Sequence, residues 1–229
     1  MTAPDDARRV APRFATVVLD VDSTLSGVEG IDWLAARRDA GTAAWVRRLT
    51  NEAMNGRITL EKAYARRLER IAPARDEVRA LAAQYRAALA PGAGAAIAEL
   101  QRAGVRVIAV SGGLREAIIP LCVDVSIPEH DVFAVGIEWD AHGAYRGFEH
   151  TSPLTTQRGK AAVLRTLALP RPMLAVGDGS TDVAMKDSGA ADQFAAFVAF
   201  VRREGVVAAA DHVLQSFDEL LSLVLSHGA

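Results

Sequence analysis

The chain has 229 residues, of which 50% are apolar and 24% are charged, a composition typical of a protein that buries a sizeable core. Its 26 lysines and arginines nearly balance 28 aspartates and glutamates, giving a formal charge of −2. This balance excludes a broad polycationic surface for nucleic acid.

The only cysteine, Cys122, excludes an internal disulfide, favours a reducing compartment and is read as a core residue. The longest apolar run, residues 194–201, is far shorter than the roughly 20 residues that span a bilayer. Residues 1–13 are charged, contain prolines and lack the apolar segment of a secretion signal, so we expect a disordered tail. We therefore expect a cytoplasmic protein that does not enter a membrane.

Three apolar runs, at residues 14–19, 105–110 and 173–176, have the pattern of strands buried on both faces. Each run ends in polar residues, and helical patterns separate the runs. The sequence therefore predicts an α/β fold with a Rossmann-like, mostly parallel sheet. Ligands of such sheets bind at the carboxyl ends of the strands.

Residues 29–88 carry no strand pattern but show helical periodicity, as in Leu60, Tyr64, Leu68 and Ile71. We expect a helical cap at 29–88, inserted after the first strand of a core formed by 14–28 and 89–229. Trp33 and Trp45 are expected to anchor the small core of this cap. Between residues 130 and 150, alternation at 132–135 and 137–139, followed by residues 141–143 and Tyr145, indicates a hairpin.

Two pairs of aspartates follow buried strands: Asp20 with Asp22, and Asp178 with Asp182. Carboxylates at such positions must be paired or bind a metal, because an uncompensated buried charge is costly. A cluster of carboxylate oxygens suits a hard cation, and Mg²⁺ is the natural candidate.

Two further features indicate an anion site. Ser111, Gly112 and Gly113 stand between a strand and a helix expected to begin near Leu114, where backbone N–H groups bind anions; a structural turn is the alternative. Lys160 begins a predicted helix, and only residues 62, 160 and 186 are lysines. A solvated helix-start lysine is the alternative reading.

Four aspartates, one Mg²⁺ and Lys160 would leave a net charge of −1, which repels a phosphate. If neighbouring charges keep one carboxyl protonated, the site is neutral and holds a general acid. Asp22 is the candidate.

Together, the segments 20–24, 111–113 and 177–182, with Lys160, resemble the four ordered motifs of the haloacid dehalogenase superfamily of phosphohydrolases. From about residue 16 to 221 the chain is similar to the phosphoserine phosphatase family. Glu29 to Asp32 follow the first motif as in that family, and Met54, Gly56 and Arg67 keep its spacing.

The resemblance implies that Asp20 is the nucleophile of an aspartyl-phosphate mechanism and that Asp22 is the general acid. It assigns Mg²⁺ to Asp20, the Asp22 carbonyl and Asp178, with Asp182 in support, and the phosphate to Ser111, Gly112 and Lys160. Glu29 would bind the ammonium and Arg67 the carboxylate of phosphoserine, a small phosphorylated metabolite. Met54 and Thr181 complete the implied substrate contacts.

Three departures from the family pattern leave alternatives open: Leu60, Leu114 and the segment 199–201. The chain could act on another small phosphomonoester or transfer the phosphoryl group to an alcohol. A catalytically silent binding module is a remote alternative, and Arg67 could belong to a solvated face with Arg66 and Arg70. The histidines show no metal-ligand spacing, and both a monomer and a homodimer are open.

Overall fold

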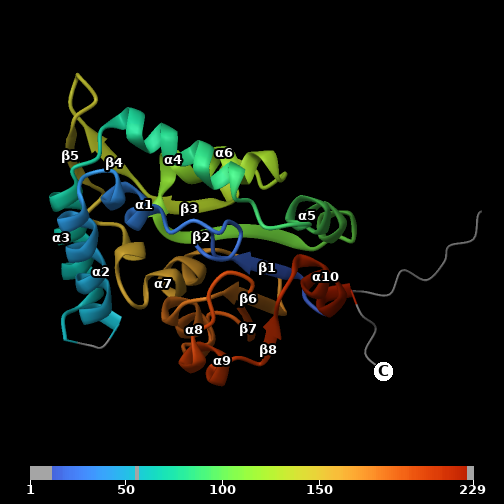
Figure 1. The fold of residues 1–229 in the computed structure, drawn as a ribbon. Coiled ribbons are helices and arrows are strands. Elements are labelled where there is room, and N and C mark those ends of the chain that lie inside the picture. The colour runs from blue at the N-terminus through green and yellow to red at the C-terminus, as the bar shows by residue number, and fades with distance from the viewer. Residues whose placement is uncertain (1–11, 55–56, 226–229) are drawn as a thin grey trace, which may run out of the picture.

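The computed structural model describes residues 12–54 and 57–225. A six-stranded parallel sheet lies at its centre in the order β3-β2-β1-β6-β7-β8 (Figure 1). The strands are β1 (Thr16–Leu19), β2 (Arg106–Leu114), β3 (Val132–Val135), β6 (Met173–Gly177), β7 (Gln193–Phe197) and β8 (His212–Leu214). The predicted α/β fold with a mostly parallel sheet is confirmed.

Strand β1 lies in the middle of the sheet, and all four of its residues are buried. It pairs with β2 on one side and β6 on the other, so that Leu19 is in register with both Ala109 and Val176. The residues that follow these three strands therefore meet at one edge of the sheet.

Six helices connect and cover these strands: α5 (Ala93–Arg102), α6 (Arg115–Asp124), α7 (Gly159–Thr166), α8 (Ser180–Asp187), α9 (Glu204–Ala209) and α10 (Phe217–Leu225). Short 3₁₀ helices lie at Glu129–Asp131 and Pro153–Thr155. Helix α5 packs against α10, and α7 against α8. Cys122 on α6 is fully buried, as predicted. No helix in the described ranges is long and apolar enough to cross a membrane.

Ahead of α5, four further helices follow β1 and form the insertion: α1 (Gly30–Ala36), α2 (Ala40–Met54), α3 (Leu60–Ile71) and α4 (Arg75–Ala87). Tyr64, Leu68 and Ile71 are buried on one face of α3, as the periodicity predicts. The segment that enters this insertion and the segment that leaves it lie side by side, since the Ala90 N–H donates to the Leu25 carbonyl at 2.9 Å. Helices α2 and α3 stand beyond one end of the sheet (Figure 1).

The hairpin predicted between residues 130 and 150 forms between β4 (Ile137–Trp139) and β5 (Tyr145–Phe148). Residues 132–135, which the alternating pattern included, join the main sheet as β3 instead. Residues 111–113 form no turn; β2 continues in extended conformation to Leu114, and α6 begins at Arg115. A register shift against β3 between Val110 and Leu114 accommodates this extension.

The two tryptophans lie at the margin of the helical insertion rather than at its centre. Both are half-buried, with Arg37 over the ring of Trp33 at 4.7 Å and Arg70 over that of Trp45 at 5.9 Å. Smaller or more slender side chains fill the interior: Leu34, Val46, Tyr64, Leu68, Leu81 and Tyr85.

Residues 1–11 of the predicted N-terminal tail lie outside the described residues, so their disorder stays a prediction. At the end of the predicted tail, the Arg13 N–H donates to the Val224 carbonyl at 2.8 Å.

Candidate active site

A cleft of about 190 Å³ opens between the carboxyl edge of the sheet and the inserted helices. Most of the residues singled out from the sequence line it: Asp20, Asp22, Glu29, Arg67, Ser111, Gly112, Lys160, Asp178 and Thr181. Asp182 is fully buried in contact with Lys160. The side chain of Met54, and Gly56, lie outside the described residues.

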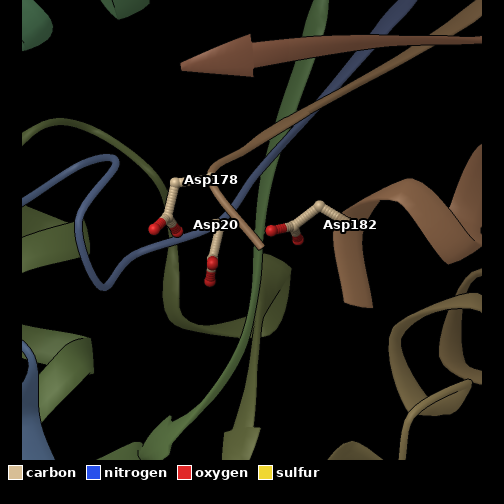
Figure 2. A group of neighbouring side chains, drawn as sticks. All are labelled: Asp20, Asp178 and Asp182. Atoms are coloured by element: carbon tan, nitrogen blue, oxygen red, sulfur yellow. The ribbon is translucent and has the colours of Figure 1, made fainter. Parts of the chain in front are cut away.

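Three carboxylates form the floor of the cleft. Asp20, Asp178 and Asp182 each place one oxygen within 4.8 Å of the others, and none is more than 7% exposed (Figure 2). Asp20 follows β1, Asp178 follows β6, and Asp182 lies in the first turn of α8. Such a buried cluster of hard oxygen donors fits a divalent cation such as Mg²⁺.

Lys160 lies between two of these carboxylates and is only 4% exposed. Its Nζ is 2.7 Å from Asp20 Oδ1 and 2.7 Å from Asp182 Oδ1. Burial favours the neutral amine, but the charges of Asp182 and Asp20 outweigh it and raise the pKa of Lys160. The alternative of a solvated lysine is therefore wrong.

Gly177 at the end of β6 is required by the position of Asp182. A Cβ at residue 177 would lie 2.2 Å from the Asp182 carboxylate carbon, so only glycine lets this carboxylate pack on the strand. Burial, followed by the charge of Asp20, raises the pKa of Asp182 to about 7. The Gly179 N–H and Lys160 offset part of that cost by hydrogen bonding.

Asp22 stands apart from this cluster, which therefore contains three rather than four side-chain carboxylates among the described residues. Its Oδ1 accepts hydrogen bonds from the Gly30 N–H at 2.6 Å and the Tyr85 hydroxyl at 2.8 Å. Burial, followed by the charges of Glu29 and Asp20, raises the pKa of Asp22 to about 7. A carboxyl with this pKa can exchange a proton near neutral pH.

Ser111 lies beside Asp22 on the extended end of β2. The Ser111 hydroxyl accepts from the Gly113 N–H at 2.9 Å and donates to Asp22 Oδ2 at 3.3 Å. Polar groups of this segment therefore face the cleft from a strand end rather than from a helix start.

Arg67 occupies the opposite end of the cleft, on the inserted helices. Its guanidinium turns inward, whereas Arg66 and Arg70 are exposed. Arg67 Nη1 donates to Thr50 Oγ1 at 3.1 Å, and its buried Nε has no hydrogen-bond partner within the described parts of the chain. Burial lowers the pKa of Arg67, and the charge of Asp32 opposes that shift most strongly.

Glu29 lies near Arg67 at the rim of the cleft, where its Oε1 accepts from the Ser23 hydroxyl at 2.7 Å. Sequence reasoning gave no role to Asp32, which also lines the cleft and has a buried Oδ1 without a partner among the residues described. Its spacing of three residues from Glu29 at the start of α1 is the signal for a shared helix face.

Arg203 is a second residue that sequence reasoning missed. It forms an ion pair with the Asp178 carboxylate, donates to the Asp178 carbonyl at 3.0 Å, and lies 3.5 Å from Glu29 Oε1. Arg203 follows the carboxyl end of β7, and this position at the active edge of the sheet is the only sequence signal for it.

Comparison with known proteins agrees with this geometry. Residues 17–186 match the family model of haloacid dehalogenase-like hydrolases. The chain therefore belongs to this family and is a phosphoric monoester hydrolase.

Within the family the chain is similar to phosphoserine phosphatases. The mouse phosphoserine phosphatase is 34% identical over 224 residues, which cover 96% of this chain and 98% of the mouse protein. A phosphoserine phosphohydrolase-like protein from Francisella tularensis has the same fold, with a TM-score of 0.82, 24% identity and coverage of 91% and 98%. A substrate-bound phosphoserine phosphatase also shares it, with a TM-score of 0.76, 24% identity and coverage of 92% and 98%.

The ion pairs of Lys160 predict a large effect on stability. Lys160→Met leaves two buried carboxylates without their cation, and should lower the free energy of unfolding by about 3–5 kcal/mol. Urea denaturation with a chelator present measures this without compensation by bound metal. Lys186→Met removes a partly exposed ion pair with Asp211, and as the control should cost less than about 1 kcal/mol. Equal losses in the two variants would contradict the structural role of Lys160.

Proposed function

We propose that this enzyme hydrolyses O-phospho-L-serine to L-serine and phosphate through a phosphorylated Asp20. One observation carries the proposal: a single cleft joins polar groups at Ser111 and Lys160 to a buried, incompletely paired guanidinium at Arg67. A compound with a phosphate at one end and a carboxylate at the other matches both. The similarity to phosphoserine phosphatases supports the same substrate.

In the first step an Asp20 carboxylate oxygen bonds to phosphorus while the bond from phosphorus to the serine oxygen breaks. Asp22 gives its proton to the departing alkoxide, which leaves as the serine hydroxyl. Ser111, Gly112 and Lys160 hold the phosphoryl oxygens, where donors fixed in advance stabilise the charge that develops.

In the second step water attacks the phosphorus of the aspartyl-phosphate. Asp22, now a carboxylate, takes a proton from this water as the new oxygen–phosphorus bond forms. The bond between phosphorus and the Asp20 oxygen breaks, which returns the carboxylate and releases inorganic phosphate. The pKa of about 7 suits Asp22 to both directions of proton transfer.

The cation in this proposal is Mg²⁺, held by Asp20, Asp178 and the Asp22 backbone carbonyl, with Asp182 in support. When bound it reduces the repulsion between the Asp20 carboxylate and the phosphate. The three buried carboxylates support this assignment, because Lys160 and Arg203 together carry fewer positive charges than the cluster carries negative ones.

Removal of the cation should therefore abolish turnover. Enzyme treated with EDTA and then freed of the chelator should be inactive, and added Mg²⁺ should restore the rate of phosphate release. Asp178→Asn should require a higher Mg²⁺ concentration for half-maximal rate, because one ligand loses its charge. Full activity in the metal-free enzyme would exclude the cation from the reaction.

In this proposal residues 29–88 form a cap over a core made of residues 14–28 and 89–229. Glu29 and Arg67 of the cap would bind the ammonium and carboxylate of the substrate, with Met54 and Thr181 as further contacts. Arg67 presents a planar fork that matches a carboxylate in two hydrogen bonds. A cytoplasmic location, and the choice between monomer and homodimer, stay predictions.

A panel of phosphomonoesters tests the substrate. Phosphoserine should be hydrolysed with a higher kcat/KM than phosphoethanolamine, which lacks the carboxylate, because only phosphoserine engages Arg67. Initial rates of phosphate release measure this directly. Equal values would refute the substrate while leaving the phosphatase chemistry intact.

Replacing Arg67 by Ala tests whether this residue causes the preference for phosphoserine over phosphoethanolamine. The KM for phosphoserine should rise by about 10–100-fold, the worth of a charged hydrogen-bonded contact, with little change for phosphoethanolamine. Arg66→Ala is the matched control, because Arg66 is the exposed neighbour on the same helix. An unchanged KM in Arg67→Ala would remove Arg67 from the substrate site.

A further inference from the structure

The two oxygens of Asp22 have different surroundings. Oδ1 accepts two hydrogen bonds, from the Gly30 N–H and the Tyr85 hydroxyl. Oδ2 accepts a single and longer hydrogen bond, from the Ser111 hydroxyl at 3.3 Å, at the end of β2 that lines the cleft. In a carboxylic acid the oxygen that accepts two donors is the carbonyl oxygen, and the other carries the proton.

Tyr85 reaches Asp22 from helix α4, 63 residues along the chain. Its side chain is fully buried, and within the described part of the chain its hydroxyl donates to Asp22 Oδ1 alone. A buried hydroxyl held in this way donates to a fixed partner rather than exchanging with water.

The approach of Tyr85 depends on Gly30. A Cβ at residue 30 would lie 2.1 Å from the Tyr85 hydroxyl oxygen, so only glycine leaves room for it. The same residue supplies the second donor to Oδ1 through its backbone N–H. Gly30 and Tyr85 therefore form one built environment around a single oxygen of Asp22.

We propose that Tyr85 is a positioning residue, which together with the Gly30 N–H anchors Asp22 Oδ1 and leaves Oδ2 as the atom that exchanges the proton. The inference rests on the proposed role of Asp22 as general acid. Oδ2–H would transfer its proton to the leaving alkoxide, and Oδ2 would later take a proton from the attacking water. Tyr85 keeps its own proton throughout and touches no reacting atom.

The test is Tyr85→Phe, assayed on two substrates that differ in their need for an acid. The alkoxide of serine requires a proton as it leaves, whereas the weakly basic p-nitrophenolate leaves without one. In Tyr85→Phe, kcat/KM for phosphoserine should fall by about 10–100-fold, and that for p-nitrophenyl phosphate by less than about threefold. This parameter reports the steps through loss of the leaving group.

Three comparisons make the outcome decisive. Tyr145→Phe removes a hydroxyl outside the cleft lining and should leave both values unchanged. Asp22→Asn should show the same dependence on leaving group; if it does not, the general-acid role fails. In the Asp22→Asn background, adding Tyr85→Phe should have no further effect. Equal loss on both substrates in Tyr85→Phe, no loss, or an effect that persists without Asp22 would overturn the inference.

Discussion

The buried ammonium of Lys160 is the interaction on which the rest of the site depends. Its two contacts of 2.7 Å join the end of β1, the start of α7 and the first turn of α8. Without a cation there, Asp20 and Asp182 would be two like charges in a medium that screens poorly. The parallel sheet brings these segments to one edge, and Lys160 allows the carboxylates to remain close together there.

The remaining charges divide the cleft into two ends with different chemistry. At the floor, Lys160 and Arg203 compensate only part of the acidic cluster, which leaves it suited to a divalent cation. On the inserted helices Arg67 is buried beside Asp32 and Glu29, so this end of the cleft presents positive and negative side chains next to each other. Asp22 lies between the two ends, held by its own donors.

The sequence predicted the parts of the structure that depend on local pattern. The apolar runs predicted the buried strands of the sheet, and their polar ends placed Asp20 and Asp178 at a common edge. Lys160, at the start of a predicted helix, joined them through the family resemblance. It failed where a contact joins distant segments: Arg203 meets Asp178 across 25 residues and Tyr85 meets Asp22 across 63. Neither arrangement has a local signature. The extended conformation of 111–113 was also missed, because two adjacent glycines favour a turn, whereas here β2 pairs with β3 again at Leu114, beyond them.

In the proposed mechanism Asp20 carries the phosphoryl group during turnover. Mass spectrometry of the enzyme after acid quench, during steady-state hydrolysis of phosphoserine with Mg²⁺, detects this group. We expect the added mass of one phosphoryl group on the peptide containing Asp20, and none in Asp20→Asn. A phosphoryl group on another residue, or undiminished turnover by Asp20→Asn, would contradict this mechanism.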